Sequence, residues 1–387
     1  MLGEHEHTEL VEGRPEGRNL GQHVDAVPLI VHHLADTLHL SRDSGQPFAR
    51  VFLNSGLHAF SYANATLKRR FSPSWKRRGY RRPVLVLVFG SVCVDRVRRV
   101  AKLPAPGGYV EIESERRYLG GEAANTATAL RSWGVPVHLA GNGFGEGPEG
   151  DELKELVEAH CLPSGLLEDE RTGATPVCDV YITPDGERTM FGRGFSGSRP
   201  AVDPGDLPYV AGEWFTAEPN MGAAAREAAR AAAEAGMKTY LMDFFREDEP
   251  IAPGSFWQSS TDWVGTRGNV QRNVEWVRNW ADRYGCFTIL SDGPNGLIAG
   301  GLGKRARHYP PFPAPVVVDT TGAGDMFRAG VLRGLHEGWP LGRSLAYGAA
   351  AGCLKCRSFG ATEDVPLAEE ILAHIAAHPE IREAYLA

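Results

Sequence analysis

The sequence predicts a three-layer α/β fold built on a doubly wound, mostly parallel sheet. From about residue 82 onward, apolar runs of strand length alternate with helical segments, as in proteins whose parallel sheet is covered on both faces. The first run, residues 84–89, is continuously apolar and ends at Gly90, as expected of a buried strand. The chain has 387 residues, enough for one large domain of this class.

The later elements follow in order. A helix is expected at residues 123–133 and a strand at 137–140. A second strand, at 177–182, alternates in polarity and ends in the turn Pro184-Asp185-Gly186, which is a hairpin signal. An alanine-rich helix follows at 221–235. The remaining strands are expected at 239–244, 262–265, 287–291, 297–299 and 316–318, and the remaining helices at 270–284, 324–337, 341–355 and 367–378, which is expected to be the last.

Composition excludes several classes of protein. No apolar run near the start of the folded part approaches the ~20 residues of a membrane helix. A net charge of −7 argues against a dedicated nucleic-acid-binding protein. Six cysteines are too sparse for a disulfide scaffold and are typical of reduced thiols. We therefore expect a cytoplasmic protein without nucleic-acid or membrane partners.

Residues 1–82 differ from the rest of the chain. Seven of the 13 histidines lie in it, acidic residues cluster in its first half, and a basic run follows from Lys68 to Arg82. We expect a poorly ordered N-terminal extension, or translated sequence upstream of the true start. An electrostatic arm or a targeting segment is the alternative, although the acidic beginning is unlike a secretory signal.

A glycine-rich segment leads into the helix expected at 324–337. It reads Val318-Asp319-Thr320-Thr321-Gly322-Ala323-Gly324-Asp325. Glycines let backbone amides approach an anion, and a helix N-terminus adds unpaired N–H groups and the positive end of the dipole. Such a cradle suits a transferring phosphoryl group, and Asp325 could take a proton from an attacking hydroxyl. The structural alternative is a capping turn with glycines for tight packing.

With this segment, residues 83–387 resemble the ribokinase-like carbohydrate kinases of the phosphofructokinase-B type. Residues 319–325 match the C-terminal signature of that family. The resemblance implies that Asp325 is the catalytic base and that Gly322, Ala323 and Gly324 form the anion hole. It also implies a small β lid, from residues of about 96–117 and 176–195, that covers the substrate and excludes water.

Two motifs resemble the family's acceptor site. Asp95 ends the segment that begins at Gly90, and it would bind substrate hydroxyls. Gly120 and Gly121 form a di-glycine motif, with Asn125 pointing at the sugar. A carboxylate can accept two hydroxyl hydrogen bonds, and polar groups collect at the ends of buried parallel strands. The alternatives are a solvated turn residue at position 95 and a helix-capping loop at positions 120–125.

Further segments resemble the family's nucleotide and cation loops. For the nucleotide, the resemblance implies ATP, bound by Thr320, Thr321, Ser291, Gly293 and Gly296. For a monovalent cation such as K⁺, it implies Asp319, Thr321, Gly360 and Ala361. Taken without the resemblance, the turn at 291–296 is equally compatible with an ordinary strand-end turn.

One family motif is altered. The family usually has Asn-x-x-Glu after the strand expected at 262–265, and its glutamate helps to position magnesium. Here Asn269 is followed by Arg272, and Glu275 comes three residues late. Either Glu275 serves after a local shift, or Mg²⁺ is held mostly by nucleotide and water.

These features predict ATP-dependent phosphorylation of a hydroxymethyl group on a small sugar of ribose, fructose or ketodeoxysugar type. A nucleoside kinase of the same fold and a non-catalytic sugar or nucleotide sensor remain as alternatives. The resemblance also suggests a homodimer formed through the lid.

Overall fold

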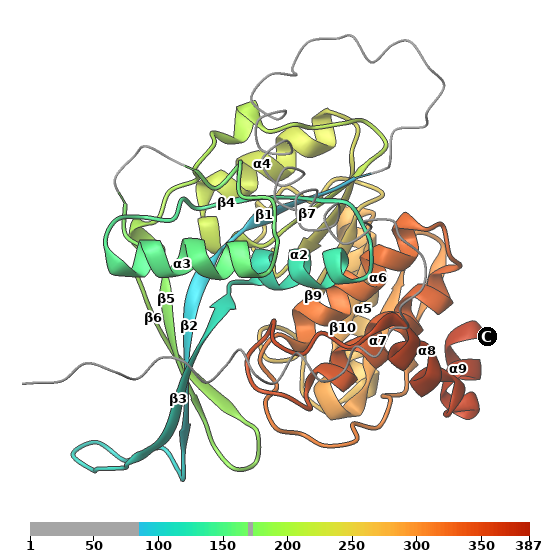
Figure 1. The fold of residues 1–387 in the computed structure, drawn as a ribbon. Helices are drawn as coiled ribbons and strands as arrows, with labels where there is room; N and C mark the ends of the chain where they lie inside the picture. The colour runs from blue at the N-terminus through green and yellow to red at the C-terminus, as the bar shows by residue number, and fades with distance from the viewer. Residues whose placement is uncertain (1–84, 169–172) are drawn as a thin grey trace, which may run out of the picture. The chain divides into compact units, whose positions relative to one another are not determined.

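The computed structural model describes residues 85–168 and 173–387, so the expected extension at 1–82 lies outside the described residues. The described chain has the predicted α/β architecture, with an eight-stranded sheet in the order β12-β11-β10-β9-β8-β7-β1-β4. The neighbours from β4 to β10 pair in parallel, whereas β11 and β12 pair antiparallel at one edge. The carboxyl ends of the six parallel strands therefore share one edge of the sheet (Figure 1).

The strands of this sheet are short and the helices connect them. The strands are β1 (Val86–Gly90), β4 (Val137–Gly141), β7 (Trp214–Ala217), β8 (Lys238–Met242), β9 (Phe256–Ser260), β10 (Phe287–Ser291), β11 (Leu297–Gly301) and β12 (Lys304–Tyr309). The helices are α2 (Glu122–Ser132), α3 (Pro148–Ala159), α4 (Ala223–Glu234), α5 (Val270–Tyr284), α6 (Ala323–His336), α7 (Leu341–Lys355), α8 (Ala368–Ala376) and α9 (Pro379–Leu386).

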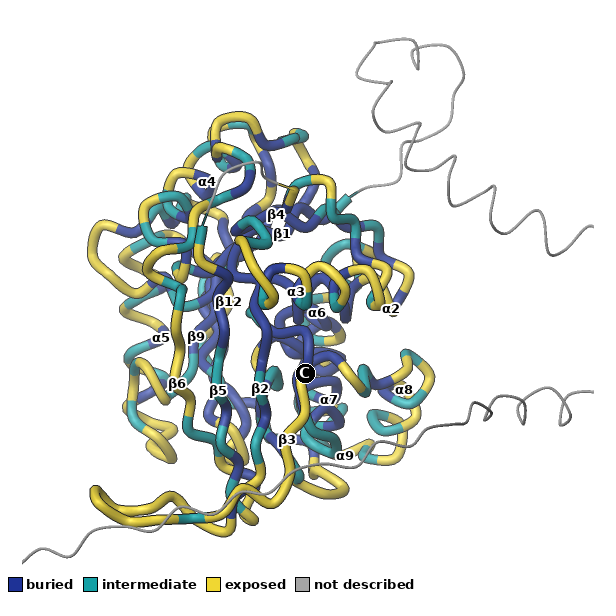
Figure 2. The backbone as a smooth tube through the Cα atoms, turned by 60° about the vertical axis from the view of Figure 1, so that its left-hand side comes forward, coloured by how far each residue is buried: buried dark blue, intermediate teal, exposed yellow. Residues whose placement is uncertain are grey.

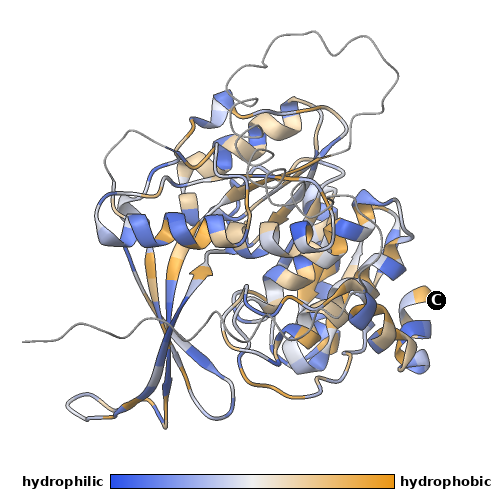
Figure 3. Ribbon diagram, in the orientation of Figure 1, coloured by the Kyte–Doolittle hydropathy of each residue, from blue (hydrophilic) through white to orange (hydrophobic). Residues whose placement is uncertain are grey.

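Two apolar cores lie on opposite faces of the sheet, because side chains alternate between the faces of a strand. In β1, Val86 and Val88 join the core with α2, α6 and α7, whereas Leu87 and Phe89 join the core with α4. Figure 2 shows the buried strands between helices whose outer sides are exposed, and Figure 3 shows the same strands as the most hydrophobic part of the molecule. The predicted three layers are confirmed.

The predicted lid is a separate four-stranded sheet in the order β3-β2-β5-β6. It comprises β2 (Cys93–Val100), β3 (Ile112–Gly120), β5 (Val177–Ile182) and β6 (Arg188–Arg193). β5 and β6 form the predicted hairpin around Gly186. Val97, Tyr118, Val180 and Ile182 form a small core of its own, against which Phe359 packs.

Two expected strands are absent from the described structure. The strand expected at 262–265 lies instead at β9, where Trp257 is fully buried between β8 and β10. Residues 262–265 form a turn, with Trp263 64% exposed and Gly265 in a left-handed conformation. The segment 316–318 is apolar but lies in a loop with Val316 and Val317 exposed. A short apolar segment forms a strand only where a neighbouring strand is available for pairing. Apolar content alone does not show which segments have such a neighbour.

The helix expected at 367–378 is not the last. It ends at Ala376, and α9 follows after a short break, with Pro379 at its first position, where proline is favoured. Tyr385 of α9 is buried in the core. Within residues 85–168 and 173–387, no helix is both long and apolar enough to span a membrane.

Candidate active site

The glycine-rich segment forms an accessible cradle at the N-terminus of α6. Gly322 precedes the helix with φ of 77°, and a Cβ there would overlap the Cβ of Ala361. Both the conformation and this contact require glycine. Ala323 and Gly324 begin the helix, and nothing lies within 4 Å of a Cβ built on Gly324. Gly324 is exposed, so an anion could reach this helix N-terminus, although the N–H of Ala323 already bonds the Thr320 carbonyl at 3.3 Å.

Asp325 lies buried at the back of this cradle. Its Oδ2 accepts a hydrogen bond from Asn125 Nδ2 at 2.8 Å, and its Oδ1 accepts one from Arg328 at 3.1 Å. Arg328 is fully buried and also donates to Thr126 Oγ1 and to the carbonyl of Glu122. Burial raises the pKa of Asp325 to about 6, against the lowering effects of Arg328 and Asn125. The carboxylate is ionised at neutral pH and held in one orientation, which suits a general base.

Asp95 lies at the start of β2, where the chain passes from the main sheet into the lid. A Cβ at Gly120 would overlap its carboxylate, so glycine at 120 makes room for this acid. The Cys93 thiol donates to Asp95 Oδ1 at 3.2 Å. Burial raises the pKa of Asp95 to about 7; the thiol hydrogen bond opposes this rise, and the charges of Asp319 and Asp325 add to it. Asp95, Asp319 and Asp325 therefore lie in one buried region of the structure.

The di-glycine motif links the surroundings of Asp95 to those of Asp325. Gly121 precedes α2 with φ of 94°, and a Cβ there would overlap the Ser91 carbonyl. This close approach sets the start of α2, which carries Asn125 to Asp325. The Oδ1 of Asn125 is buried and has no hydrogen-bond partner in the structure. It is therefore available to accept a hydrogen bond from a ligand.

Loops 319–321 and 360–361 meet as the sequence predicts. Asp319 Oδ1 accepts the N–H of Thr321 at 2.8 Å, and Oδ2 accepts the N–H of Gly360 at 2.9 Å. Thr320 faces the lid, because its hydroxyl accepts a hydrogen bond from Arg188 of β6 at 2.7 Å. The Thr321 hydroxyl is buried without a hydrogen-bond partner.

Comparisons with known proteins give the family and the fold of this chain. The model of the pfkB family carbohydrate kinases matches residues 84–253 and 261–368. This chain belongs to the pfkB family of carbohydrate kinases. It is therefore a sugar kinase.

Relatives of this pfkB kinase cover most of its length. An uncharacterized sugar kinase of Dictyostelium discoideum is 28% identical over 344 residues, which is 74% of this chain and 96% of that protein. A nucleoside kinase of Methanocaldococcus jannaschii is 24% identical over 297 residues, 75% and 96% of the two chains. The structure of Arabidopsis thaliana ribokinase complexed with ribose and ATP matches with a TM-score of 0.59 at 20% identity, over 76% of this chain and 99% of that one. The match to this ribokinase structure shows that the two chains share a fold.

The turn at 291–296 has mixed roles in the pfkB kinase. Gly296 has φ of 90°, and a Cβ there would overlap the Tyr309 carbonyl, so packing alone requires this glycine. Gly293 is open, with nothing within 4 Å of a built Cβ. Between Ser291 and Gly293, buried Asp292 accepts the hydroxyl of Thr261 at 2.7 Å and the N–H of Gly268 at 2.8 Å. The turn thereby anchors the loop that leads to α5.

The altered Asn-x-x-Glu motif has a structural role here. Asn269 caps α5 by accepting the N–H of Arg272 at 3.1 Å, which is what an N-cap asparagine does. Buried Asn273 bonds both the N–H and the carbonyl of Thr266. Glu275 is exposed in the second turn of α5. Its role with magnesium stays a prediction.

Several charged residues of the site were not singled out in the sequence. Glu218 is fully buried after β7 and accepts the N–H groups of Ser91 and Asn220. Burial raises the pKa of Glu122, and nearby Glu218, Asp325 and Asp243 raise it further. Burial also raises the pKa of Asp243 to about 6. Arg328 is the buried guanidinium that favours the ionised forms of Glu122, Asp243 and Asp325. Arg328 follows Asp325 by three residues on the same helix, a spacing that predicts an ion pair and could have identified it in the sequence.

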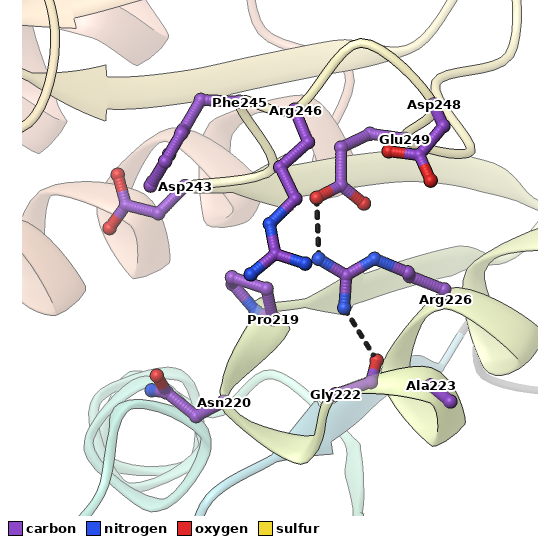
Figure 4. Close-up of a pocket in the computed structure, with 10 residues that line it drawn as sticks. All are labelled: Pro219, Asn220, Gly222, Ala223, Arg226, Asp243, Phe245, Arg246, Asp248 and Glu249. Atoms are coloured by element: carbon purple, nitrogen blue, oxygen red, sulfur yellow. Dashed lines mark hydrogen bonds and ion pairs between the residues drawn. The ribbon is translucent and has the colours of Figure 1, made fainter.

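A pocket opens beside Asp243, at the end of β8 (Figure 4). Arg226 of α4 lies in it, bonded to Glu249 at 2.6 Å and to the Gly222 carbonyl at 2.8 Å. Figure 4 shows Arg246 extending into the same pocket toward Pro219. The pocket therefore carries both positive and negative side chains.

Proposed function

We propose that this pfkB kinase transfers the γ-phosphoryl group of ATP to a hydroxymethyl group of a small sugar, of ribose, fructose or ketodeoxysugar type. The observation that carries the proposal is the setting of Asp325, a buried carboxylate held by Asn125 and Arg328 directly behind the N-terminal amides of α6. Phosphoryl transfer needs a base on the attacking hydroxyl and fixed dipoles on the transferring group. Residues 322–325 offer both within one helical turn.

Asp325 would take the proton of the sugar hydroxyl as its oxygen bonds to phosphorus. The amides of Gly322, Ala323 and Gly324 would stabilise the charge on the transferring group. Asp95 and the unpartnered Oδ1 of Asn125 would accept hydrogen bonds from other hydroxyls of the sugar. Asn125 would thus have two tasks, since its Nδ2 already holds the base.

ATP would place its phosphates at the cradle, with its remaining parts toward Thr320, Thr321 and the turn at 291–296. Magnesium, when bound, would neutralise charge on the phosphate oxygens. Within residues 85–168 and 173–387, no group of three or more histidine, cysteine or acidic side chains is arranged to hold a metal. We therefore propose that phosphates and water provide most of the metal's ligands, with Glu275 as an outer contributor at most.

The lid would close over the acceptor and exclude water from the reaction. Arg188 is the lid residue that reaches the cradle, through its hydrogen bond to the Thr320 hydroxyl. Its charge also favours the ionised form of Asp325. We propose that Arg188 contacts the transferring phosphoryl group when the substrates are bound.

A substrate panel tests the proposal. ATP consumption is measured with ribose, fructose, 2-keto-3-deoxygluconate and adenosine, with Asp325→Asn as the inactive control. Turnover with a sugar and none with adenosine is the expected result. Turnover only with adenosine would favour the nucleoside kinase alternative, which the Methanocaldococcus jannaschii relative supports. Binding without turnover of any acceptor would favour the sensor.

The lid also offers a surface for a homodimer. Met190 and Phe191 of edge strand β6 are 51% and 59% exposed, and exposed apolar side chains on an unpaired edge favour association. We propose a dimer through this edge strand. Light scattering of the parent and of a Met190→Lys/Phe191→Lys variant tests it, and equal masses would contradict it.

A further inference from the structure

A buried lysine lies beside the loops that resemble a monovalent cation site. Lys355, the last residue of α7, is fully buried. Its Nζ donates to the carbonyl of Ser358 at 3.0 Å and to the Ser358 hydroxyl at 3.4 Å. Burial lowers the pKa of Lys355, and the charge of Asp319, which is also fully buried, opposes that lowering. A buried ammonium is rare unless an opposite charge accompanies it, and here that charge is Asp319.

Most of the oxygens around Asp319 already accept a hydrogen bond, although the buried Thr321 hydroxyl has no partner in the structure. Both of its carboxylate oxygens accept backbone N–H groups, from Thr321 and Gly360. The Cys356 carbonyl accepts the N–H groups of Val318 and Asp319, at 2.7 and 3.2 Å. The Ser358 carbonyl accepts the Lys355 ammonium. A potassium ion would need such carboxylate and carbonyl oxygens as ligands.

The balance of charges around Asp319 also argues against a bound potassium ion. Asp319 carries one negative charge, and Lys355 supplies one positive charge in the same buried region. The nearby charges of Arg357 and Asp364 are paired with each other at 2.8 Å. A bound potassium ion would add a second buried cation to a single carboxylate, which is costly. The residues present do not fit an exchangeable monovalent cation.

We propose that the Lys355 ammonium is the permanent cation of these loops, and that it makes the kinase independent of potassium. Lys355 is then a positioning residue. It balances Asp319, whose two hydrogen bonds join the 319–321 and 360–361 loops, and Ala361 packs on Gly322 of the cradle. The proposal uses the proposed function only for its rate measurement.

The first experiment compares K⁺ with tetramethylammonium at constant ionic strength, in the full-length protein. The melting temperature is measured without substrates and the rate with the best acceptor of the panel. We expect neither to change between the two salts. A higher melting temperature or rate in K⁺ would overturn the proposal. The melting temperature keeps the test valid even when no acceptor is phosphorylated.

The second experiment removes the ammonium. Lys355→Ala leaves space beside Asp319, whereas Lys355→Met fills that space with a neutral chain. In tetramethylammonium both variants should lose about tenfold or more in rate, because the cradle is less well positioned. K⁺ or NH₄⁺ should raise the melting temperature and rate of Lys355→Ala but not those of Lys355→Met.

An alanine variant that is indifferent to every cation would overturn the proposal, because Lys355 would then not stand at a cation position. If Lys355→Ala is unfolded in both salts, the parent protein decides. Potassium stimulation of the parent refutes the built-in cation, and indifference supports it.

Discussion

Asp95→Asn should stabilise the protein while weakening its sugar binding. The Asp95 carboxyl is buried, its one hydrogen bond comes from the weak Cys93 thiol donor, and its pKa is raised to about 7 from a usual 3.8. A group whose pKa is raised in the folded state contributes stability below its unfolded pKa, and that contribution is lost as the pH rises through the folded pKa. At neutral and higher pH the folded protein therefore holds an unfavourable charge that asparagine would not carry.

The magnitude follows from the shift. A rise from 3.8 to about 7 corresponds to about 4 kcal/mol of unfolding free energy at pH 8.5, where the folded carboxyl is ionised. At pH 5 the folded carboxyl is mostly protonated, and the same relation leaves roughly 2 kcal/mol. Urea unfolding of parent and variant at the two pH values measures this difference, and the KM for the sugar should rise in the variant.

Asp292→Asn is the matched control. The Asp292 carboxylate follows β10 and is buried like that of Asp95. It differs in accepting two good hydrogen bonds, from the Thr261 hydroxyl and the Gly268 N–H. An amide can accept only one of them, so the variant should lose about 1–3 kcal/mol at both pH values. The reasoning about Asp95 is refuted if Asp95→Asn is less stable than the parent at pH 8.5, or if its effect does not change with pH.

Four other outcomes are expected. Asp325→Asn should keep ATP and sugar binding but lose ~10²–10⁴-fold in turnover, and near-parental turnover would remove it as the base. In the proposed mechanism Asp325 and Asp95 must be ionised, and their pKa values are about 6 and 7. We therefore expect kcat/KM to fall below pH 7 and more steeply below pH 6, with a shallower fall for Asp95→Asn. A flat profile down to pH 5 would contradict this. Arg188→Ala should lower kcat, whereas Arg188→Lys should restore part of it, and equal kcat values for all three proteins would exclude a role in transfer. Deleting residues 1–82 should leave activity and melting temperature nearly unchanged, and a large drop in either would mean that the segment packs on the kinase domain.

The sequence was informative where the site is made by consecutive residues. The loop-to-helix segment ending in Gly322-Ala323-Gly324-Asp325 would bind an anion through its own backbone, and the structure places it at the N-terminus of α6 as predicted. The same holds for the hairpin of β5 and β6, whose turn residues define it. Local chemistry was sufficient for both.

It was less informative where long-range contacts decide. In the sequence, Lys355 resembles any basic residue at the C-terminus of a helix. Only the fold shows that it is buried near Asp319. Arg188 comes from the lid and Glu218 from the loop after β7, so no sequence spacing connects them to the cradle. The central strand β9 was missed because it contains the polar residues Gln258 and Ser259, which are buried. The structure accommodates Gln258 there because its side chain accepts a hydrogen bond from Tyr240 and donates one to the carbonyl of Gly324.

The lid is joined by direct contacts to the loops at 319–321 and 359–361. Phe359 packs into the lid's own core, and the ring of Tyr118 fills the space where a side chain on residue 360 would be. The N–H of Gly360 is bonded to Asp319, which also holds Thr321 beside the cradle. A displacement of the lid sheet therefore strains the backbone that sets the anion-binding amides. If the lid covers the acceptor as proposed, its closure and the positioning of the amides would be coupled, and a sugar that leaves the lid displaced would react slowly even when it binds well.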